Sequence, residues 1–521
     1  DEVTIQVGPP APVAVAGPDR AVGVRGTVVL DGSNSTDPED DPLAYEWTVA
    51  STPLGATAAL SSSSAAKPAF TWDGAGTYVL RLVVSDGIDR SAPDELVITA
   101  AELPPVAAVT AWTAANAGDD VVLDGSASTD PDGDALSYAW TLSRPAGSAA
   151  ALSSATAATP SFVPDVPGTY RWTLVVSAAG ATSEPATGTV EVLPGVAWLD
   201  HRVIDAEYSD ALDQIVTVSS GPNRLNVVDP ETATATSVAL PLAPTSVSVS
   251  PDGTYAAVGH AANVSYVRLS PLALVKTWPV SADAGDVVLG GNGYAYVFPS
   301  SDQWVAIHSV NLATGAETLS GGWSIYDNTR ARLHPSGTKI YGAENGISPS
   351  DIERYDVSGG TAMYAYDSPY HGDYAMCGDL WITDDGQRIL TACGNVFRAS
   401  DVAAEDMVYA GNVRPSGDQL GSFEIRHADH SAAAGRFLVA PGAPPTPYGW
   451  GGTDDTTVRV HSDAFLALEE VVTLPRAAAG GAVRDLYGRF VFWKADGSAR
   501  YAIVQVEPEA GVLLDYAVVA F

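Results

Sequence analysis

Two short acidic clusters are the first residues whose types and spacing indicate chemistry. Each places three aspartates within five positions, and the members are Asp37, Asp40, Asp41 and Asp130, Asp132, Asp134. Like charges this close repel one another unless a cation neutralises them, and Ca²⁺, with roughly six to eight oxygen ligands, suits irregular loops better than Mg²⁺. The alternative is an ordinary solvated turn stabilised by aspartate side chains. The clusters are therefore candidate Ca²⁺ sites.

The two cysteines, Cys377 and Cys393, flank the candidate hairpin CGDLWITDDGQRILTAC. With the turn centred on Asp385, they would lie directly opposite one another on neighbouring strands. Facing Cα atoms are about 4.5–5.5 Å apart, which is within reach of a disulfide. A pair of buried thiols is the alternative. The spacing favours a disulfide, and hence an oxidising compartment.

Catalytic motifs are lacking in this sequence. It contains no G-x-S-x-G, H-E-x-x-H, P-loop or dinucleotide-binding pattern. The most metal-like cluster is His427-Ala428-Asp429-His430. On a strand, His427 and Asp429 share one face while His430 points to the other, which does not suit a three-ligand site. We therefore assign no catalytic residue and no metal to it.

The acidic clusters lie in two copies of one module. DGSNSTDPEDDPLAYEW (31–47) matches DGSASTDPDGDALSYAW (124–140) at an offset of 93 residues. GTYVLRLVVSDG (76–87) matches GTYRWTLVVSAAG (168–180) at an offset of 92 residues. Each copy follows a proline-rich joint and contains short alternating strands with turn residues between them. The chain thus begins with a tandem duplication.

These motifs resemble PKD domains, the immunoglobulin-like sandwiches that serve as spacers and adhesive modules in surface proteins and secreted enzymes. The W-x-F-G-D-G segment of many PKD domains is replaced here by YEWTVA and YAWTLS, which indicates a divergent branch. Some members bind Ca²⁺, so the resemblance implies Ca²⁺ at the acidic clusters. Asp86, a further candidate ligand, is matched by Ala178, so we expect a stronger site in the first copy. We interpret the Y-x-W aromatics as sandwich core.

From about residue 197 the sequence changes to repeats of roughly 40–50 residues, each with two candidate hairpins closed by turns such as P-D-G and A-T-G. Four strands per repeat is typical of a β-propeller blade. The repeats resemble YVTN-type and lactonase-like seven-bladed propellers, whose motifs are generic. They begin near residues 200, 244, 286, 330, 376, 422 and 481. The predicted fold class is all-β: Ig-like β-sandwiches at 1–102 and 103–195, and a seven-bladed β-propeller at 196–521.

Long, aromatic-rich connections fall at 321–328, 366–374 and 440–455. In a propeller, connections between blades and those joining second to third strands emerge on one face, and we expect only tight turns on the opposite face. Aromatic rings with nearby Asp and Asn suit binding of carbohydrate or peptide. The alternative is that these loops pack their aromatics against themselves. The candidate ligand-binding residues are Trp323, Tyr326, Tyr370, His371, Tyr374, Tyr448 and Trp450.

Composition restricts the functional classes. The net charge of −36 argues against nucleic acid and anionic membrane surfaces as partners, and no apolar run is long enough to span a membrane. Asp1 is not a start residue, so we expect an export signal to have been removed. The leading hypothesis is a non-catalytic secreted or cell-surface protein, with the PKD pair as spacer and the propeller as recognition head for an extracellular glycan or protein. The alternatives are a secreted hydrolase or lyase and a self-assembling surface-layer or filament subunit.

Overall fold

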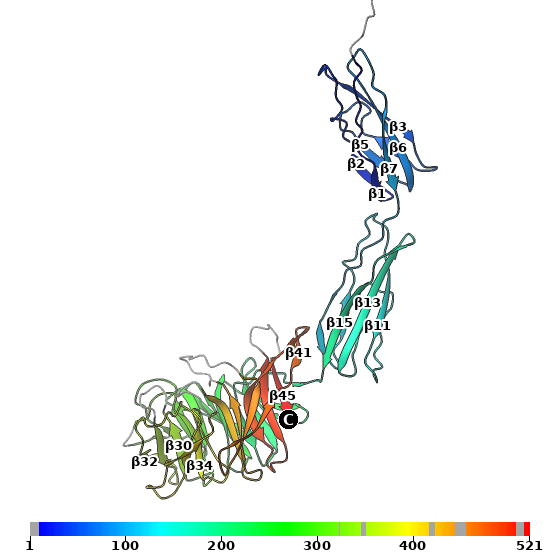
Figure 1. Ribbon diagram of the computed structural model, residues 1–521. Helices are drawn as coiled ribbons and strands as arrows, with labels where there is room; N and C mark the ends of the chain where they lie inside the picture. The colour runs from blue at the N-terminus through cyan, green and yellow to red at the C-terminus, as the bar shows by residue number, and fades with distance from the viewer. Residues whose placement is uncertain (1–9, 322–323, 345–350, 416–422, 443–454, 507–514) are drawn as a thin grey trace, which may run out of the picture. The chain divides into compact units, whose positions relative to one another are not determined.

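The computed structural model describes residues 10–321, 324–344, 351–415, 423–442, 455–506 and 515–521 (Figure 1). Every regular element in these ranges is a β-strand, and they hold no helix of the length and apolarity that a membrane crossing needs. The chain divides into two compact units, Asp1–Val192 and Leu193–Phe521. The fold is therefore all-β, as the sequence predicted.

The first module pairs a four-stranded sheet, ordered β1-β7-β6-β3, with a three-stranded sheet, ordered β2-β5-β4. β1 runs parallel to β7, and the other pairs are antiparallel. The strands are β1 (Arg20–Val22), β2 (Gly26–Val29), β3 (Ala44–Ser51), β4 (Ala58–Leu60), β5 (Ala69–Trp72), β6 (Gly76–Ser85) and β7 (Asp94–Ala100).

The second module repeats this two-sheet arrangement. One sheet is ordered β11-β13-β15-β9, with β14 paired to β13, and the other is ordered β12-β10-β8. The strands are β8 (Thr110–Ala111), β9 (Ala114–Asn116), β10 (Val121–Asp124), β11 (Ser137–Ser143), β12 (Ser161–Phe162), β13 (Gly168–Ala178), β14 (Ala181–Thr182) and β15 (Ala186–Leu193).

The duplicated motifs build the core of each sandwich. Trp47 and Trp140 are 1% and 3% exposed, which confirms the interpretation of the Y-x-W tryptophans as core. The D-G-S glycine lies against this ring in both copies: a Cβ on Gly32 would lie 3.1 Å from Trp47, and one on Gly125 would lie 2.9 Å from Trp140. Only glycine allows this approach without displacing the indole, which explains why the motif contains glycine.

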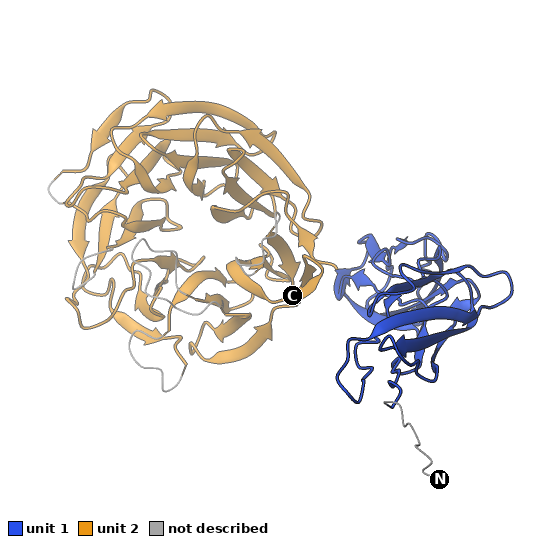
Figure 2. Ribbon diagram, turned by 90° about the horizontal axis from the view of Figure 1, so that it is seen from above, with its two compact units in different colours: residues 1–192 blue, residues 193–521 orange. Residues whose placement is uncertain are grey.

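The second unit consists of seven four-stranded antiparallel sheets arranged in a ring (Figure 2). In six of them the four strands follow one another in sequence. Blades one to three comprise β17 (Asp205–Ser209), β18 (Gln214–Ser219), β19 (Arg224–Val228), β20 (Ala235–Ala239), β21 (Pro244–Val249), β22 (Tyr255–His260), β23 (Asn263–Arg268), β24 (Ala273–Pro279), β25 (Ala284–Leu289), β26 (Tyr294–Pro299), β27 (His308–Asn311) and β28 (Glu317–Leu319).

Blades four to six continue the same order. They comprise β29 (Arg330–Leu333), β30 (Lys339–Ala343), β31 (Ile352–Asp356), β32 (Met363–Asp367), β33 (Leu380–Ile382), β34 (Arg388–Thr391), β35 (Asn395–Arg398), β36 (Tyr409–Asn412), β37 (Ile425–Ser431), β38 (Arg436–Pro441), β39 (Thr457–Ser462) and β40 (Leu468–Thr473).

The seventh blade closes the ring by combining both ends of the unit. Its order is β43 (Leu486–Trp493), β44 (Arg500–Val506), β45 (Tyr516–Ala520) and β16 (Ala197–Trp198), and a short hairpin, β41 (Ala477–Ala479) with β42 (Ala482–Arg484), precedes it. The sequence placed the start of the first repeat near residue 200, but β16 belongs to the last blade. Pairing β16 with β45 gives the last blade its fourth strand and leaves one open edge fewer.

One apolar cluster lies between each pair of adjacent blades. The cluster between blades one and two includes Val216 and Val258, and the cluster between blades seven and one includes Ile503 and Ile215. Seven such clusters are formed by the described residues, one for each interface of the ring. Both faces of each blade are therefore buried, so packing between blades does not explain why the innermost strands carry polar residues.

The cysteine pair forms a disulfide between Cys377 and Cys393, with the Cα atoms 5.2 Å apart. The expected geometry was wrong in one detail. The ladder pairs Leu380 with Thr391, so both cysteines lie just beyond β33 and β34 and are not directly opposite one another. Cys377 has a positive φ of 56°, and this bend of the backbone brings the segment before β33 close to the segment after β34.

The opposite face of the propeller does not carry only tight turns. The connection between β35 and β36 spans residues 399–408 and packs against blade four. Within it, buried Asp406 accepts hydrogen bonds from Tyr341 Oη at 2.8 Å and Arg354 Nη1 at 2.8 Å. A buried carboxylate held in this way fixes a loop that the sequence offered no reason to expect.

Candidate functional site

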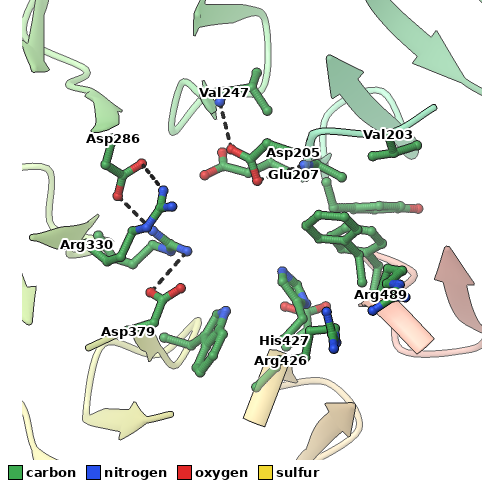
Figure 3. A pocket seen from close by; sticks show the side chains of 18 of the residues that line it. Val203, Asp205, Glu207, Val247, Asp286, Arg330, Asp379, Arg426, His427 and Arg489 are labelled. Atoms are coloured by element: carbon green, nitrogen blue, oxygen red, sulfur yellow. Dashed lines mark hydrogen bonds and ion pairs between the residues drawn. The ribbon is translucent and has the colours of Figure 1, made fainter. Parts of the chain in front are cut away.

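A cavity of about 1470 Å³ lies along the axis of the propeller. All seven innermost strands contribute to its wall, and Figure 3 shows acidic, basic and aromatic side chains from several blades facing one another across it. Its acidic, basic and aromatic lining includes Asp205, Glu207, Asp286, Arg330, Arg332, Asp379, Trp381, His427, Asp429, Phe490 and Phe492. We call this space the propeller channel.

Each innermost strand is an edge strand, and acidic side chains of one blade satisfy backbone N–H groups of the next. Val247 N–H donates to Asp205 Oδ2 at 2.8 Å, and Val249 N–H donates to Glu207 Oε2 at 2.6 Å. Ala331 N–H donates to Asp286 Oδ2 at 2.9 Å. These carboxyl groups therefore join neighbouring blades as well as lining the channel.

Two arginines of β29 are engaged by carboxylates of the neighbouring blades. Arg332 Nη1 lies 3.4 Å from Asp286 Oδ2, and its Nη2 lies 3.5 Å from Asp379 Oδ1. Arg330 Nη1 lies 3.8 Å from Asp286 Oδ1. Burial opposes the charge of Arg332, but Asp379 and Asp286 outweigh it and raise the pKa of the guanidinium. This part of the channel is therefore a paired, charged network.

Asp205 and Glu207 lie on one face of β17, two residues apart. Within the described part of the chain, neither forms an ion pair with a basic side chain within 4.0 Å. Burial raises the pKa of Asp205 to about 6 and that of Glu207 to about 8, against a smaller opposing effect of the backbone hydrogen bonds and the arginines. At neutral pH, Glu207 is thus largely protonated.

His427 presents a neutral ring to the channel. Its Nδ1 accepts the Val491 N–H at 3.3 Å, so its own proton resides on Nε2. Burial, and then the charge of Arg332, lowers the pKa of His427 to about 3. Its ring contacts Trp381 and Phe492 edge to face, with centroids 5.8 Å and 5.2 Å away. The result is an aromatic wall that carries an N–H donor.

Trp381 adds a second donor to this wall. The residue is 9% exposed, and its indole Nε1 is buried without a hydrogen-bond partner among the described residues. An unsatisfied buried N–H is costly, so a ligand acceptor that reached it from the channel would stabilise it.

Asp429 and His430 separate as the strand geometry predicted. Trp493 N–H donates to Asp429 Oδ2 at 2.6 Å, and burial raises the pKa of Asp429 to about 7. His430 instead packs edge to face against Phe437, with ring centroids 4.9 Å apart, and its Nε2 lies 3.7 Å from Asp463 Oδ2. His427 and Asp429 share the channel, and His430 lies on the other side of the strand.

The predicted aromatic residues fall in different surroundings. Tyr326 lines the channel, and its hydroxyl accepts a hydrogen bond from Gln303 Nε2 at 3.0 Å. Tyr370 and Tyr374 pack edge to face with centroids 4.8 Å apart, and Tyr374 stacks on Tyr409 at 4.1 Å. The last two therefore form a packed cluster at blade five. Outside the described residues lie the predicted Trp323, Tyr448 and Trp450.

His371 lies in an acidic group at blade four. Its Nδ1 is 3.1 Å from Asp351 Oδ2, and Asp351, Asp367 and His371 each offer one ligand atom within 4.8 Å of the others. Ser368 Oγ and the Ile352 N–H also donate to Asp351. These internal bonds stabilise the group without an ion, so we assign no metal to it.

The acidic loops of the two PKD modules share one device. In the first, the N–H groups of Glu39 and Asp41 donate to Asp37 Oδ1 at 2.9 and 3.1 Å. Asp130 Oδ1 accepts the equivalent pair at 2.9 and 3.1 Å. In both, Oδ2 is buried without a hydrogen-bond partner among the described residues. Each aspartate therefore forms the predicted turn and still has an acceptor to offer.

The modules differ in what surrounds this acceptor. In the second module, Glu102, Asp130 and Asp132 each offer an oxygen within 4.8 Å of the others. Asp132 also accepts the Val24 N–H of the first module at 2.9 Å, and Asp134 lies 3.2 Å from Arg25.

In the first module the further predicted ligands are arranged differently. Asp86 Oδ1 accepts two backbone N–H groups at 2.6 and 2.7 Å, which lowers its pKa, and Asp40 adopts a positive φ of 59°. The described residues of the first module form no comparable group of three.

Sequence reasoning missed most of the channel residues. A usable signal was present: the first strands of the repeats carry polar residues two apart, as in Asp205-Ala206-Glu207 and Arg330-Ala331-Arg332. In a blade whose two faces are buried, such alternation indicates a side that faces a channel.

Comparisons with known proteins agree with the sandwich modules. Residues 16–100 match the family model of the K319L-like PKD domain, and residues 102–192 match a PKD domain model. A comparison with curated proteins found no match.

Among solved structures, hydrazine synthase of Kuenenia stuttgartiensis is 15% identical, with a TM-score of 0.43, over 60% of this chain and 96% of that chain. The β-propeller domain of Myceliophteria thermophila Cps50 (Swd1) is 11% identical, with a TM-score of 0.44, over 59% and 95%. The seven radial sheets themselves carry the description of the second unit. The chain is thus a tandem pair of PKD domains followed by a seven-bladed β-propeller.

Proposed function

We propose that this chain is a secreted or cell-surface binding protein, in which the PKD pair is a spacer and the propeller channel binds a glycan. PKD domains together with a propeller suggest an extracellular binding or structural role, and the disulfide is compatible with export. The location and the ligand are parts of the proposal.

The observation that carries the proposal is the mixed wall of the channel. Trp381 and His427 offer N–H donors beside aromatic faces, and carboxyl groups of β17 offer acceptors across the same space. Saccharides present alternating hydroxyl groups and apolar ring faces, which match such a wall. A concave site enclosed by seven strands also suits a narrow chain better than the broad surface of a folded protein.

The experiment is a glycan and peptide array probed with the full chain, followed by calorimetry on the hits. Trp381→Phe retains the ring and removes the N–H donor, and we expect it to weaken binding about ten-fold or more. Trp112→Phe, at an exposed tryptophan of the second PKD module, is the matched control. Hits whose affinity is unchanged in Trp381→Phe would place the binding surface outside the channel and refute the proposal.

We also propose that Ca²⁺ binds the second PKD module, at Glu102, Asp130 and Asp132. The buried acceptors Glu102 Oε1 and Asp130 Oδ2 lack hydrogen-bond partners among the described residues, and this donor set fits a hard cation. Burial and three neighbouring aspartates raise the pKa of Glu102, and bound Ca²⁺ would reverse that shift. This proposal replaces the sequence-based preference for the first module.

Hydrolysis or elimination of the bound saccharide is the second candidate function. The observation that favours it is that Glu207 and Asp205 share one face of β17 with pKa values of about 8 and about 6, since a protonated Glu207 beside an ionised Asp205 could act as a general acid. Prolonged incubation with array hits and analysis of the products by mass spectrometry distinguishes the two. Products that disappear in Glu207→Gln would establish an enzyme.

A further inference from the structure

We infer that the channel binds a saccharide carrying a free amine, with Asp205 and Glu207 receiving the ammonium group. The inference rests on the proposed function, because it specifies the ligand of the same site. It depends on four features: the placement of the two carboxyl groups, the wall opposite, and, among the described residues, the lack of a cation paired with them and of a third ligand for a metal.

The two carboxyl groups are placed by strand geometry. Asp205 and Glu207 project from the same side of β17 toward the channel, near the side chains of other blades (Figure 3). Glu207 uses Oε2 to accept the Val249 N–H, and Asp205 accepts the Val247 N–H at Oδ2 and the Ala206 N–H at Oδ1. These bonds hold both side chains in place, and each carboxylate retains lone pairs for a ligand.

The arginines of β29 do not pair with Asp205 or Glu207. Arg332 contacts Asp286 and Asp379, and Arg330 contacts Asp286, so two guanidinium groups are matched by two carboxylates. Their field reaches Asp205 and Glu207 only at longer range. Two acidic groups of β17 therefore have no cationic partner within 4.0 Å in the part of the chain that the structure describes, and an added ammonium would supply one.

A metal ion is a poorer occupant than an organic cation. Among the described residues, the groups of three or more ligand atoms within 4.8 Å of one another lie at Asp351 and at Glu102, not in the channel. Ca²⁺ and Mg²⁺ need more oxygen ligands than two side chains supply. An ammonium ion needs three acceptors at most and tolerates an aromatic neighbour, which Phe490 and Phe492 provide.

The opposite wall accounts for the remainder of the ligand. Trp381 Nε1–H and His427 Nε2–H are donors, so they call for hydroxyl or carbonyl acceptors rather than for a second ammonium. A hydroxylated ring with one amine combines these requirements. A lysine side chain also satisfies the carboxyl groups, but its only acceptors for the donors are backbone carbonyls at the far end of a four-carbon chain, whereas an amino sugar carries hydroxyl groups on the same ring as its amine.

Binding of an amine should release protons. Glu207 is largely protonated at pH 7, and a bound ammonium favours its ionised form. The charged and titratable groups that line the channel on or next to the other inner strands include Asp286, Arg330, Arg332, Asp379, Arg426, His427, Asp429, His430 and Arg489. The pKa of Glu207, about 8, lies above that of Asp205, about 6, and that of Asp429, about 7, so the release should depend mainly on Glu207.

The experiment is isothermal titration calorimetry of the full chain with glucosamine oligosaccharides, their fully N-acetylated counterparts and cello-oligosaccharides of equal length. Measurements at pH 7 in buffers of different ionisation enthalpy report the protons released. We expect the amine form to bind at least ten-fold tighter than either neutral form, with net proton release. Glu207→Gln and Asp205→Asn should remove the preference, whereas Asp252→Asn, at an exposed turn, should not.

Each other outcome is decisive. Equal affinity for the amine and neutral sugars, lost in Trp381→Phe, would overturn this inference and leave the proposed glycan function intact. Tight binding of a lysine-rich peptide without glucosamine binding would overturn the saccharide assignment. Failure of all the oligosaccharides to bind would overturn this inference, and the glycan array decides the proposed function separately. Heat of Ca²⁺ binding that disappears in Glu207→Gln would replace the amine by a metal.

Discussion

Glu207 makes the stability of the propeller depend on pH in a way that one substitution should remove. Burial raises the pKa of this carboxyl from 4.5 to about 8 in the folded chain. Between these pH values the folded protein binds a proton that the unfolded chain releases. The contribution of the protonated Glu207 to the free energy of unfolding is fully present below pH 4.5 and is lost as the pH rises through 8. Glu207→Gln retains an acceptor for the Val249 N–H and cannot ionise.

Other titratable groups of the channel limit the pH range in which the effect of Glu207 on stability can be measured. The lowered pKa of His427, about 3, makes stability rise with pH up to about 6.5, which masks the acids at lower pH. Asp205 and Asp429, with pKa values of about 6 and 7, contribute mostly below pH 7. Between pH 6.5 and 8, Glu207 therefore dominates. A window of 1.5 pH units corresponds to about 2 kcal/mol at most, or about 3 °C in Tm for a unit of this size.

The assay is differential scanning calorimetry at pH 6.5 and pH 8, following the transition of the propeller. The Tm of the wild-type propeller should fall by about 3 °C from pH 6.5 to pH 8. The Tm of Glu207→Gln should fall by about 1 °C or less, because the other titratable groups remain. Glu405→Gln, at an exposed position, is the control and should behave as wild type. An equal loss in wild type and Glu207→Gln would refute the assignment of a protonated Glu207 in the channel.

Three further predictions concern other parts of the chain. Thiol titration of the unfolded, unreduced protein should read near zero, and replacing Cys377 and Cys393 by serine should cost about 3 kcal/mol for a loop of about 15 residues; two free thiols would contradict this. Ca²⁺ should raise the Tm of the PKD transition in wild type and in Glu39→Gln but not in Glu102→Gln, and equal shifts in all three would exclude the proposed site. Gly32→Ala should destabilise the first module by about 1–3 kcal/mol, because the new Cβ meets the core tryptophan; an unchanged melt would show that the indole can move.

Much of the fold could be predicted because its determinants are local. The D-G-S and G-T-Y segments recur at a nearly constant offset, and the glycine and tryptophan that they specify meet in the core of each sandwich. Turns with glycine, such as the one at Gly253, mark the hairpins, and their spacing predicts the number of blades. The cysteine pair was found for the same reason, since a hairpin brings residues on either side of its turn together.

The channel was decided by tertiary structure alone. Asp205 and His427 are more than 200 positions apart in the sequence, and they face one space only because β16 pairs with β45 and closes the ring. Each polar residue of an inner strand is ambiguous locally, since an exposed strand shows the same alternation. Burial in the assembled ring raises the pKa of Glu207 and leaves Trp381 Nε1 without a partner among the described residues. A short sequence pattern cannot encode these properties, because they arise from seven strands that meet only in the folded propeller.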